Sequence, residues 1–123
     1  MGASIGRVLG SIALAAMGAS ATQAASIDIE GVWGNREGCR AVRGADSNGS
    51  MLILRRDKIE GAEFQCDFLS AKRGSDGSHT VRADCAQEGV ETIVQIRIGA
   101  ERKGVRTFKA NQGWHFDPVS KCR

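Results

Sequence analysis

The residues of this sequence that could do chemistry are few. His115 and Asp117 stand two positions apart, so on a strand they would share a face, as part of a catalytic or metal site would. Neighbours at this spacing commonly just pair on the surface, and no partner for either is recognisable elsewhere in the sequence. No serine stands in a nucleophile-elbow motif, and no glycine-rich phosphate loop is present. We therefore expect a protein that is not an enzyme and has no catalytic residue, cofactor or metal site.

Cysteines supply the best-defined chemistry. The chain contains four of them, which are Cys39, Cys66, Cys85 and Cys122. An even set in an exported chain favours two disulfides. The alternative, a metal or redox site, lacks a Cys-x-x-Cys motif and has only His79 and His115 to supply imidazole. Structural disulfides are the prediction.

The position of one turn predicts how the cysteines pair. If a simple hairpin is centred on Ser75 and Asp76, paired residues have numbers that sum to 151, and Cys66 and Cys85 meet that sum. Directly opposed residues on antiparallel strands lie about 4.5 Å apart at Cα when not hydrogen-bonded, a separation that a disulfide tolerates. We prefer this bridge, with the first and last cysteines forming the second, over the other two pairings that four cysteines allow.

The N-terminal stretch has the three-part layout of a secretory signal peptide. Arg7 is its one charge, an apolar run follows at 8–17, and small residues continue to Ala25. The run is about ten residues long, whereas a membrane-spanning helix needs roughly 20, so a retained anchor is the weaker interpretation. Cleavage would divide the sequence into a signal peptide at 1–24 and a single disulfide-bonded domain at 25–123. The protein should then be periplasmic or secreted, with no membrane span.

Size and charge narrow the classes of partner. Roughly 100 mature residues make one domain with a modest core, short enough that covalent bracing is expected. Without Arg7 the net charge falls to +2, against +3 for the whole sequence, and both signs are scattered along the chain. So small an excess of positive charge argues against a protein that binds nucleic acid. We expect a monomer whose partner is a protein, an envelope component or a small ligand.

Short alternating runs between turn signals predict an all-β domain. In the run from Phe64 to Phe68, apolar and polar residues alternate strictly, so one face is buried and the other wet. No stretch after residue 26 keeps apolar residues at helical spacing for three turns. A hairpin-type turn is expected at Ser47–Gly49. The expected strands cover 27–33, 51–55, 64–68, 81–85, 94–98, 105–109 and 114–116. We predict an antiparallel meander of about six to eight strands, closed into a small barrel or folded into a sandwich.

One motif resembles a known opening strand. Gly31-Val32-Trp33, with Asn35 and Gly38 behind it, resembles the Gly-x-Trp opening of calycin-type barrels such as lipocalins, avidins and small bacterial metalloprotease inhibitors. The resemblance implies a barrel, but the aromatic set with which avidins enclose biotin is missing, so no ligand residues carry over. In those inhibitors the mature N-terminal segment enters the protease cleft, which here would be Ser26–Glu30.

A second likeness spans most of the mature chain. The sequence is similar to uncharacterised small periplasmic cysteine-containing proteins of proteobacteria. The likeness rests on Gly-x-Trp with a cysteine soon after, Ile59-x-Gly61-x-Glu63-x-x-Cys66, Cys85-x-x-Glu88-Gly89 and a C-terminal cysteine. It implies a location and a fold, and no activity.

Export, bracing and the lack of catalytic groups together predict a non-enzymatic binding module. It would be either inhibitor-like or a small-ligand-binding β-barrel. The alternative is an envelope-associated structural or stress protein whose surface, including Arg55, Arg56 and Lys58, contacts peptidoglycan or anionic lipopolysaccharide.

Three residues are candidates for ligand contact. Trp33 and Trp114 lie near the two ends of the mature chain, and in a closed barrel the first and last strands are neighbours. Core packing is the commoner role for such rings, with ligand contact as the alternative. A closed pocket holding His115 beside a carboxylate would instead favour an enzyme.

Overall fold

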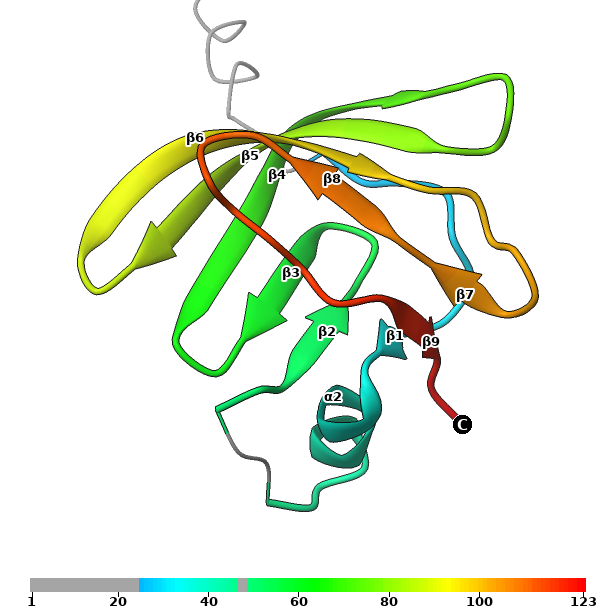
Figure 1. The fold of residues 1–123 in the computed structure, drawn as a ribbon, viewed down its shortest axis with the longest axis vertical. Helices are drawn as coiled ribbons and strands as arrows, with labels where there is room; N and C mark the ends of the chain where they lie inside the picture. The colour runs from blue at the N-terminus through cyan, green and yellow to red at the C-terminus, as the bar shows by residue number, and fades with distance from the viewer. Residues whose placement is uncertain (1–24, 47–48) are drawn as a thin grey trace, which may run out of the picture.

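A computed structural model describes residues 25–46 and 49–123 of the chain. The expected signal peptide at 1–24, and two of the three residues of the expected turn at Ser47–Gly49, lie outside the described residues. In the described part, strands form one antiparallel sheet that curls into a nearly closed barrel, with one short helix beside it (Figure 1).

Nine strands make up the sheet, in the order β7-β9-β1-β2-β3-β4-β5-β6-β8. Their bounds are β1 Trp33–Gly34, β2 Leu52–Leu54, β3 Lys58–Gly61, β4 Phe64–Arg73, β5 His79–Gln87, β6 Val90–Ile98, β7 Val105–Arg106, β8 Phe108–Ala110 and β9 Val119–Lys121. The helix α2 spans Arg36–Val42. The prediction of an all-β antiparallel barrel is confirmed. The strand count exceeds six to eight because several of these elements are only two or three residues long.

Thr107 alone separates the two edge strands of the sheet along the chain. β7 pairs with β9, where Val105 faces Ser120, and β8 pairs with β6, where Phe108 faces Ile98. One continuous segment therefore meets both edges of the sheet. This arrangement nearly closes the barrel.

Alternating side chains on the long strands fill the barrel. The buried residues of β5 and β6 recur at every second position, and they are His79, Val81, Ala83, Cys85, Val94, Ile96 and Ile98. Ile59 and Phe68 reach the same core from β3 and β4, and both are fully buried. Burying an apolar side chain of this size stabilises the fold by about 1.5–3 kcal/mol. The interior is thus a packed core that is apolar apart from His79.

The helix α2 was not predicted, because seven residues give too few turns for a periodic pattern. Its N-cap is Asn35, whose side-chain oxygen accepts from the amides of Gly38 at 2.7 Å and Leu52 at 2.9 Å. Such a cap satisfies amides that the first helical turn leaves without partners. A Cβ atom on Gly38 would overlap the carbonyl oxygen of Leu52, so glycine allows the helix to pack against β2.

The strand expected at 27–33 is wrong except at its end, since only Trp33 of that range lies in a strand. Ile27 and Ile29 are nevertheless buried in the core. The amide of Ile27 donates to the carbonyl oxygen of Arg56 at 2.7 Å, a single backbone bond in place of a ladder. The alternation of apolar and polar residues in this segment correctly indicated which side chains are buried. It did not indicate whether the backbone pairs with a neighbouring strand.

The last strand expected at 114–116 is also wrong. Gln112 and Gly113 take the left-handed conformation, and the chain then runs without regular structure as far as Pro118. Proline has no amide hydrogen to donate to a ladder. The aromatic rings of this segment pack on the end of the barrel, and the true last strand, β9, begins at Val119.

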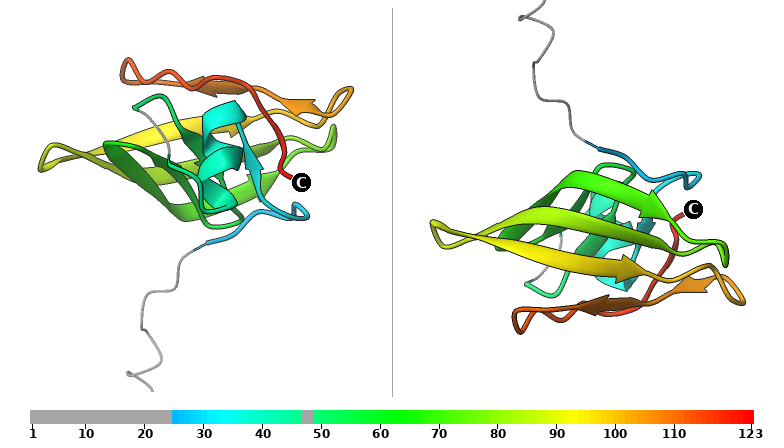
Figure 2. Two further views of the ribbon diagram at one scale, coloured as in Figure 1. Left: turned by 90° about the horizontal axis from the view of Figure 1, so that it is seen from below. Right: turned by 90° about the horizontal axis from the view of Figure 1, so that it is seen from above.

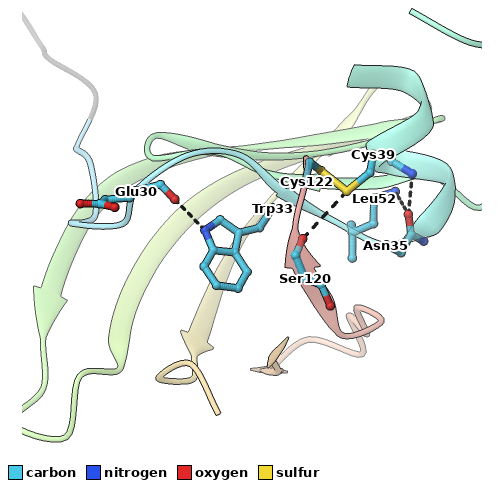
Figure 3. The surroundings of a disulfide bond; sticks show 8 residues. Glu30, Trp33, Asn35, Cys39, Leu52, Ser120 and Cys122 are labelled. Carbon is cyan, nitrogen blue, oxygen red and sulfur yellow. Dashed lines mark hydrogen bonds between the residues drawn. A yellow bond between two sulfur atoms is a disulfide. The ribbon is translucent and has the colours of Figure 1, made fainter. Parts of the chain in front are cut away.

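Both predicted disulfides are present. Cys66 and Cys85 face each other across β4 and β5 with Cα atoms 3.9 Å apart, and both are fully buried. Cys39 on α2 bonds to Cys122, just after β9, with a Cα separation of 5.2 Å (Figure 3). This second bridge ties the C-terminus to the helix.

The hairpin between β4 and β5 differs from the one assumed. Near the turn Arg73 faces His79, so paired numbers there sum to 152 and the turn is centred one half-residue further on. An irregularity in the pairing around Leu69 then restores the expected sum, and Phe68 faces Ala83. A β-bulge inserts one extra residue into one strand. The disulfide prediction is therefore correct although the turn that suggested it was misplaced.

Candidate functional site

Trp33 belongs to the core. It is 6 % exposed, and its indole nitrogen donates to the carbonyl oxygen of Glu30 at 3.0 Å (Figure 3). The guanidinium of Arg106 lies over the ring, 4.6 Å from its centre. With one face covered by a cation and the rest packed, Trp33 is a structural residue.

Trp114 and His115 lie elsewhere. Trp114 is half-buried against Phe64, with ring centres 5.4 Å apart. His115 and Asp117 are both exposed, and within the described residues no hydrogen bond or ion pair joins them. The barrel therefore does not bring Trp33 and Trp114 into one site, and His115 is not enclosed beside a carboxylate.

The basic residues expected to contact the envelope are engaged within the molecule. The Nε atom of Arg55 lies 2.7 Å from a carboxylate oxygen of Glu60. Arg56 donates from its Nε to the carbonyl oxygen of Ile27 at 3.4 Å. Lys58 is half-buried and faces Asp67 across β3 and β4. Of these three residues, Arg55 alone makes an ion pair in the described part of the chain.

The segment Ser26–Glu30 is anchored to the barrel. Ile27 and Ile29 are 2 % and 5 % exposed. The carboxylate of Asp28 lies 3.2 Å from a guanidinium nitrogen of Arg73. Withdrawing this segment would expose two core side chains, so it lies on the barrel as part of the domain.

A basic surface lies on the outer face of β4, β5, β6 and β8, which run side by side in the right-hand view of Figure 2. Strand register aligns Lys72, Thr80, Arg97 and Lys109 in one row across the four strands. The next row along contains Ser70, Arg82 and Gln95. Neighbouring strands are about 4.8 Å apart, so the Cα atoms of Lys72, Arg82, Arg97 and Lys109 fall within about 15 Å of one another. We call Lys72, Arg82, Arg97 and Lys109 the basic face.

A hollow of about 300 Å³ opens in the basic face. Lys72 and Arg82 line it together with the polar residues Ser70, Thr80 and Gln95 and the apolar residues Ala71 and Val81, and no carboxylate lies in its lining. Ammonium, guanidinium, hydroxyl and amide groups all donate hydrogen bonds. This donor set suits phosphate, sulfate or carboxylate oxygens, since bonds between charged partners are the stronger ones.

Three of the four side chains of the basic face make no ion pair within the described residues. Arg97 alone among the four makes an ion pair in the described structure, at 2.7 Å from Asp76. Asp76 accepts hydrogen bonds from the hydroxyl and amide of Ser78 at 2.6 and 3.0 Å, and these bonds are the main reason that the pKa of Asp76 lies below its ordinary value. The carboxylate therefore stays ionised beside Arg97, while the remaining three cations face solvent.

Sequence reasoning found parts of this surface without seeing it whole. Strand alternation placed Arg82 and Arg97 on the outward faces of their strands. Their alignment with Lys72 and Lys109 depends on the register of four neighbouring strands, and β8 pairs with β6 only after the intervening segment 99–107. A count of charges along the chain carries no signal of that alignment.

His79 is a polar group inside the barrel. It is 4 % exposed, and neither ring nitrogen has a hydrogen-bond partner among the described residues. Burial is the main cause that lowers the pKa of His79; the charges of Arg106 and Arg73 lower it further, and Asp28 opposes them. The imidazole is thus held in its neutral form.

The described part of the chain defines a small, disulfide-braced, nearly closed antiparallel barrel. No protein-family model, no curated protein and no solved structure matches the sequence. None of the helices in the described residues is long and apolar enough to cross a membrane. The arguments for function therefore come from the geometry of the basic face and its hollow.

Proposed function

We propose that this protein is a non-enzymatic binding module, exported to the periplasm or beyond, that holds a phosphate-bearing envelope component such as lipopolysaccharide on its basic face. The observation that carries the proposal is the hollow between Lys72 and Arg82, whose lining contains two cations and three uncharged polar side chains and no carboxylate. Lys109 and Arg97 widen the positive surface around it. Clustered charges of one sign attract oppositely charged partners over distances set by the ionic strength.

The packed interior supports binding on the surface. Phe68 and Ile96 are fully buried at the centre of the barrel, and Trp33 is nearly so. A ligand inside the barrel would have to displace these side chains, at a cost of the order of 2–5 kcal/mol for each that is removed from the core. A partner on the outer face displaces none of them.

An inhibitor that works through Ser26–Glu30 is less well supported. The buried side chains of Ile27 and Ile29 and the ion pair of Asp28 hold this segment against the barrel. Entry into a protease cleft would require these contacts to break first. Binding through the basic face needs no such rearrangement.

The test is binding of the oxidised mature protein to purified lipopolysaccharide at graded salt. We expect the triple variant Lys72→Gln, Arg82→Gln and Lys109→Gln to bind about tenfold more weakly at low salt, because exposed charge contacts contribute about 0.2–1 kcal/mol each. Affinity of the unaltered protein should fall as salt rises, and the variant should respond less.

A matched control removes the same charge elsewhere. The variant Arg36→Gln, Arg43→Gln and Arg123→Gln neutralises three exposed residues on or near α2, away from the basic face. It should bind as the unaltered protein does. If both triple variants lost the same affinity, net charge alone would explain the effect, and a site on the basic face would be contradicted.

A further inference from the structure

The segment between β8 and β9 crosses the barrel on its way to the last strand (Figure 1). Four aromatic rings pack together along this segment and the strands beside it. Trp114 stacks on Phe116 with ring centres 6.0 Å apart and meets Phe64 edge-on at 5.4 Å. Phe108 supports Phe116 from β8 at 5.5 Å. Phe116 is buried, whereas Trp114 and Phe64 remain half-exposed. The cluster therefore holds a tryptophan ring in place at the surface.

A hollow of about 380 Å³ opens beside Trp114 and Phe64. Its other side chains are those of Gln87, Gln112 and His115, all exposed. No carboxylate, ammonium or guanidinium group lies in the lining. Flat apolar rings thus stand beside amide groups that both donate and accept hydrogen bonds.

The turn that carries Gln112 is held firmly. The side-chain oxygen of Asn111 accepts from the amide of Gln95 at 2.9 Å, and the amide of Asn111 donates back to the carbonyl oxygen of Gln95 at 3.2 Å. The amide of Trp114 closes the turn on Asn111 at 3.2 Å. Groups that are already ordered lose less conformational entropy when a ligand binds.

We propose that this hollow binds a sugar ring. The apolar face of a pyranose stacks on an aromatic ring, and its hydroxyl groups need uncharged donors and acceptors at the rim, which is what Trp114, Gln87 and Gln112 present. A purely apolar ligand would bury the amides without partners, which is costly. An anion would find no cation in this lining, so the hollow is distinct in chemistry and in residues from the basic face.

The test is an NMR titration of the 15N-labelled oxidised domain with tetrasaccharides of β-1,4-linked N-acetylglucosamine and of maltose units. The protein has two tryptophans, so two indole signals are expected, and the Trp114→Phe variant assigns them. We expect at least one sugar to move the Trp114 signal and the side-chain amides of Gln87 and Gln112, while the Trp33 signal stays. If neither sugar moves the Trp114 signal at about 10 mM, enough to detect millimolar binding, the proposal is wrong.

A matched pair of variants keeps the fold and separates the site from the turn. Gln112 and Lys103 both precede a glycine and both take the left-handed conformation, with φ of 61° and 52°. Glycine adopts this conformation without strain, so Gln112→Gly and Lys103→Gly should both fold. We expect Gln112→Gly to weaken sugar binding about fivefold, the loss of a hydrogen bond or two, and Lys103→Gly to leave it unchanged.

The outcome is independent of the basic face. The triple variant Lys72→Gln, Arg82→Gln and Lys109→Gln leaves the aromatic hollow intact and should bind the sugar as the unaltered protein does. Sugar binding that falls in that variant and persists in Gln112→Gly would overturn the assignment to the aromatic hollow. Failure of lipopolysaccharide binding alone would leave the sugar site standing.

Discussion

The guanidinium carbon of Arg106 lies 4.6 Å from the centre of the Trp33 ring. Arg106 comes from β7 and Trp33 from β1, and β9 lies between these two strands in the sheet. Arg106 also donates from Nη1 to the carbonyl oxygen of Gly99 at 3.1 Å. The contact therefore joins three elements on the side of the barrel where the sheet closes, and it has consequences for stability.

We expect Arg106→Gln to lower the free energy of unfolding by about 1–2 kcal/mol. A cation over a tryptophan ring contributes from about 0.5 kcal/mol when exposed to about 2 when desolvated, and Arg106 is half-buried. Urea denaturation of the oxidised protein measures the loss. Arg102→Gln, which removes an exposed cation from the neighbouring turn, is the control and should change stability by less than about 0.5 kcal/mol. Equal effects would mean that the ring contact contributes little.

The buried His79 predicts how stability depends on pH. Because its pKa in the folded state lies below the ordinary value of 6.5, the unfolded chain binds the proton more readily, and stability falls as pH drops below about 6.5. As the pH falls from about 7.5 to about 5.5, the unaltered protein should therefore lose stability relative to His79→Leu. Thermal unfolding across this range measures it.

Three charged groups also affect the pKa of His79, so variants of these groups should change how stability depends on pH. Arg106 and Arg73 oppose protonation of the ring, and Asp28 favours it. Asp28→Asn should therefore steepen the loss of stability at acid pH, and Arg106→Gln should soften it. His115→Gln alters an exposed histidine and should leave the pH dependence unchanged. A flat profile in the unaltered protein would contradict a neutral, buried His79.

The two disulfides should differ in how readily they are reduced. Cys66 and Cys85 are fully buried, whereas Cys39 and Cys122 are only partly so. Since a reductant must reach the sulfur atoms, mild dithiothreitol in native buffer should open Cys39–Cys122 first. Mass spectrometry after alkylation identifies the free thiols. Simultaneous release of all four would show that global unfolding precedes reduction.

Removing the bridge that closes the longer loop should lower the free energy of unfolding more than removing the other. The bridges close loops of 19 and 83 residues by sequence separation. In the chain-entropy model such loops correspond to about 3 and 4.5 kcal/mol. Double alanine variants at each bridge, compared by urea denaturation, check the order. A larger loss at the short loop would point to damage in the core around Cys66 and Cys85.

Gly38 should tolerate no side chain. A Cβ atom on Gly38 would overlap the carbonyl group of Leu52. Because this carbonyl belongs to the backbone and cannot rotate away like a side chain, α2 would have to shift away from β2. We expect Gly38→Ala to lower the free energy of unfolding by about 3 kcal/mol, the upper end for overpacked positions. Gly49→Ala is the control, because no atom lies within 4 Å of the added methyl group. Similar stabilities for the two variants would contradict the close packing of α2.

The sequence predicted well what depends on neighbouring residues. Alternation in β4, β5 and β6 identified the inward faces that carry Phe68, Val81 and Ile96, because successive side chains on a strand point to opposite sides wherever the strand pairs. The bridge between Cys66 and Cys85 followed from that pattern and one turn. The predicted bridge is correct although the turn was misplaced, because the irregularity near Leu69 shifts the strand register back by one residue.

Tertiary structure decided what depends on pairing between distant segments. Alternation has the same period whether a segment pairs or simply lies on the core, so it could not tell that Ile27 and Ile29 pack without a ladder, or that Trp114 crosses the barrel end. The row that aligns Lys72 with Lys109 depends on three consecutive pairings, β4 with β5, β5 with β6 and β6 with β8, and the segment 99–107 intervenes before β8 returns to β6. The register of β8 on β6 and the closure of the sheet by β7 and β9 depend on hydrogen bonds between strands that no single tight turn connects, so the alternation of residue types did not predict them.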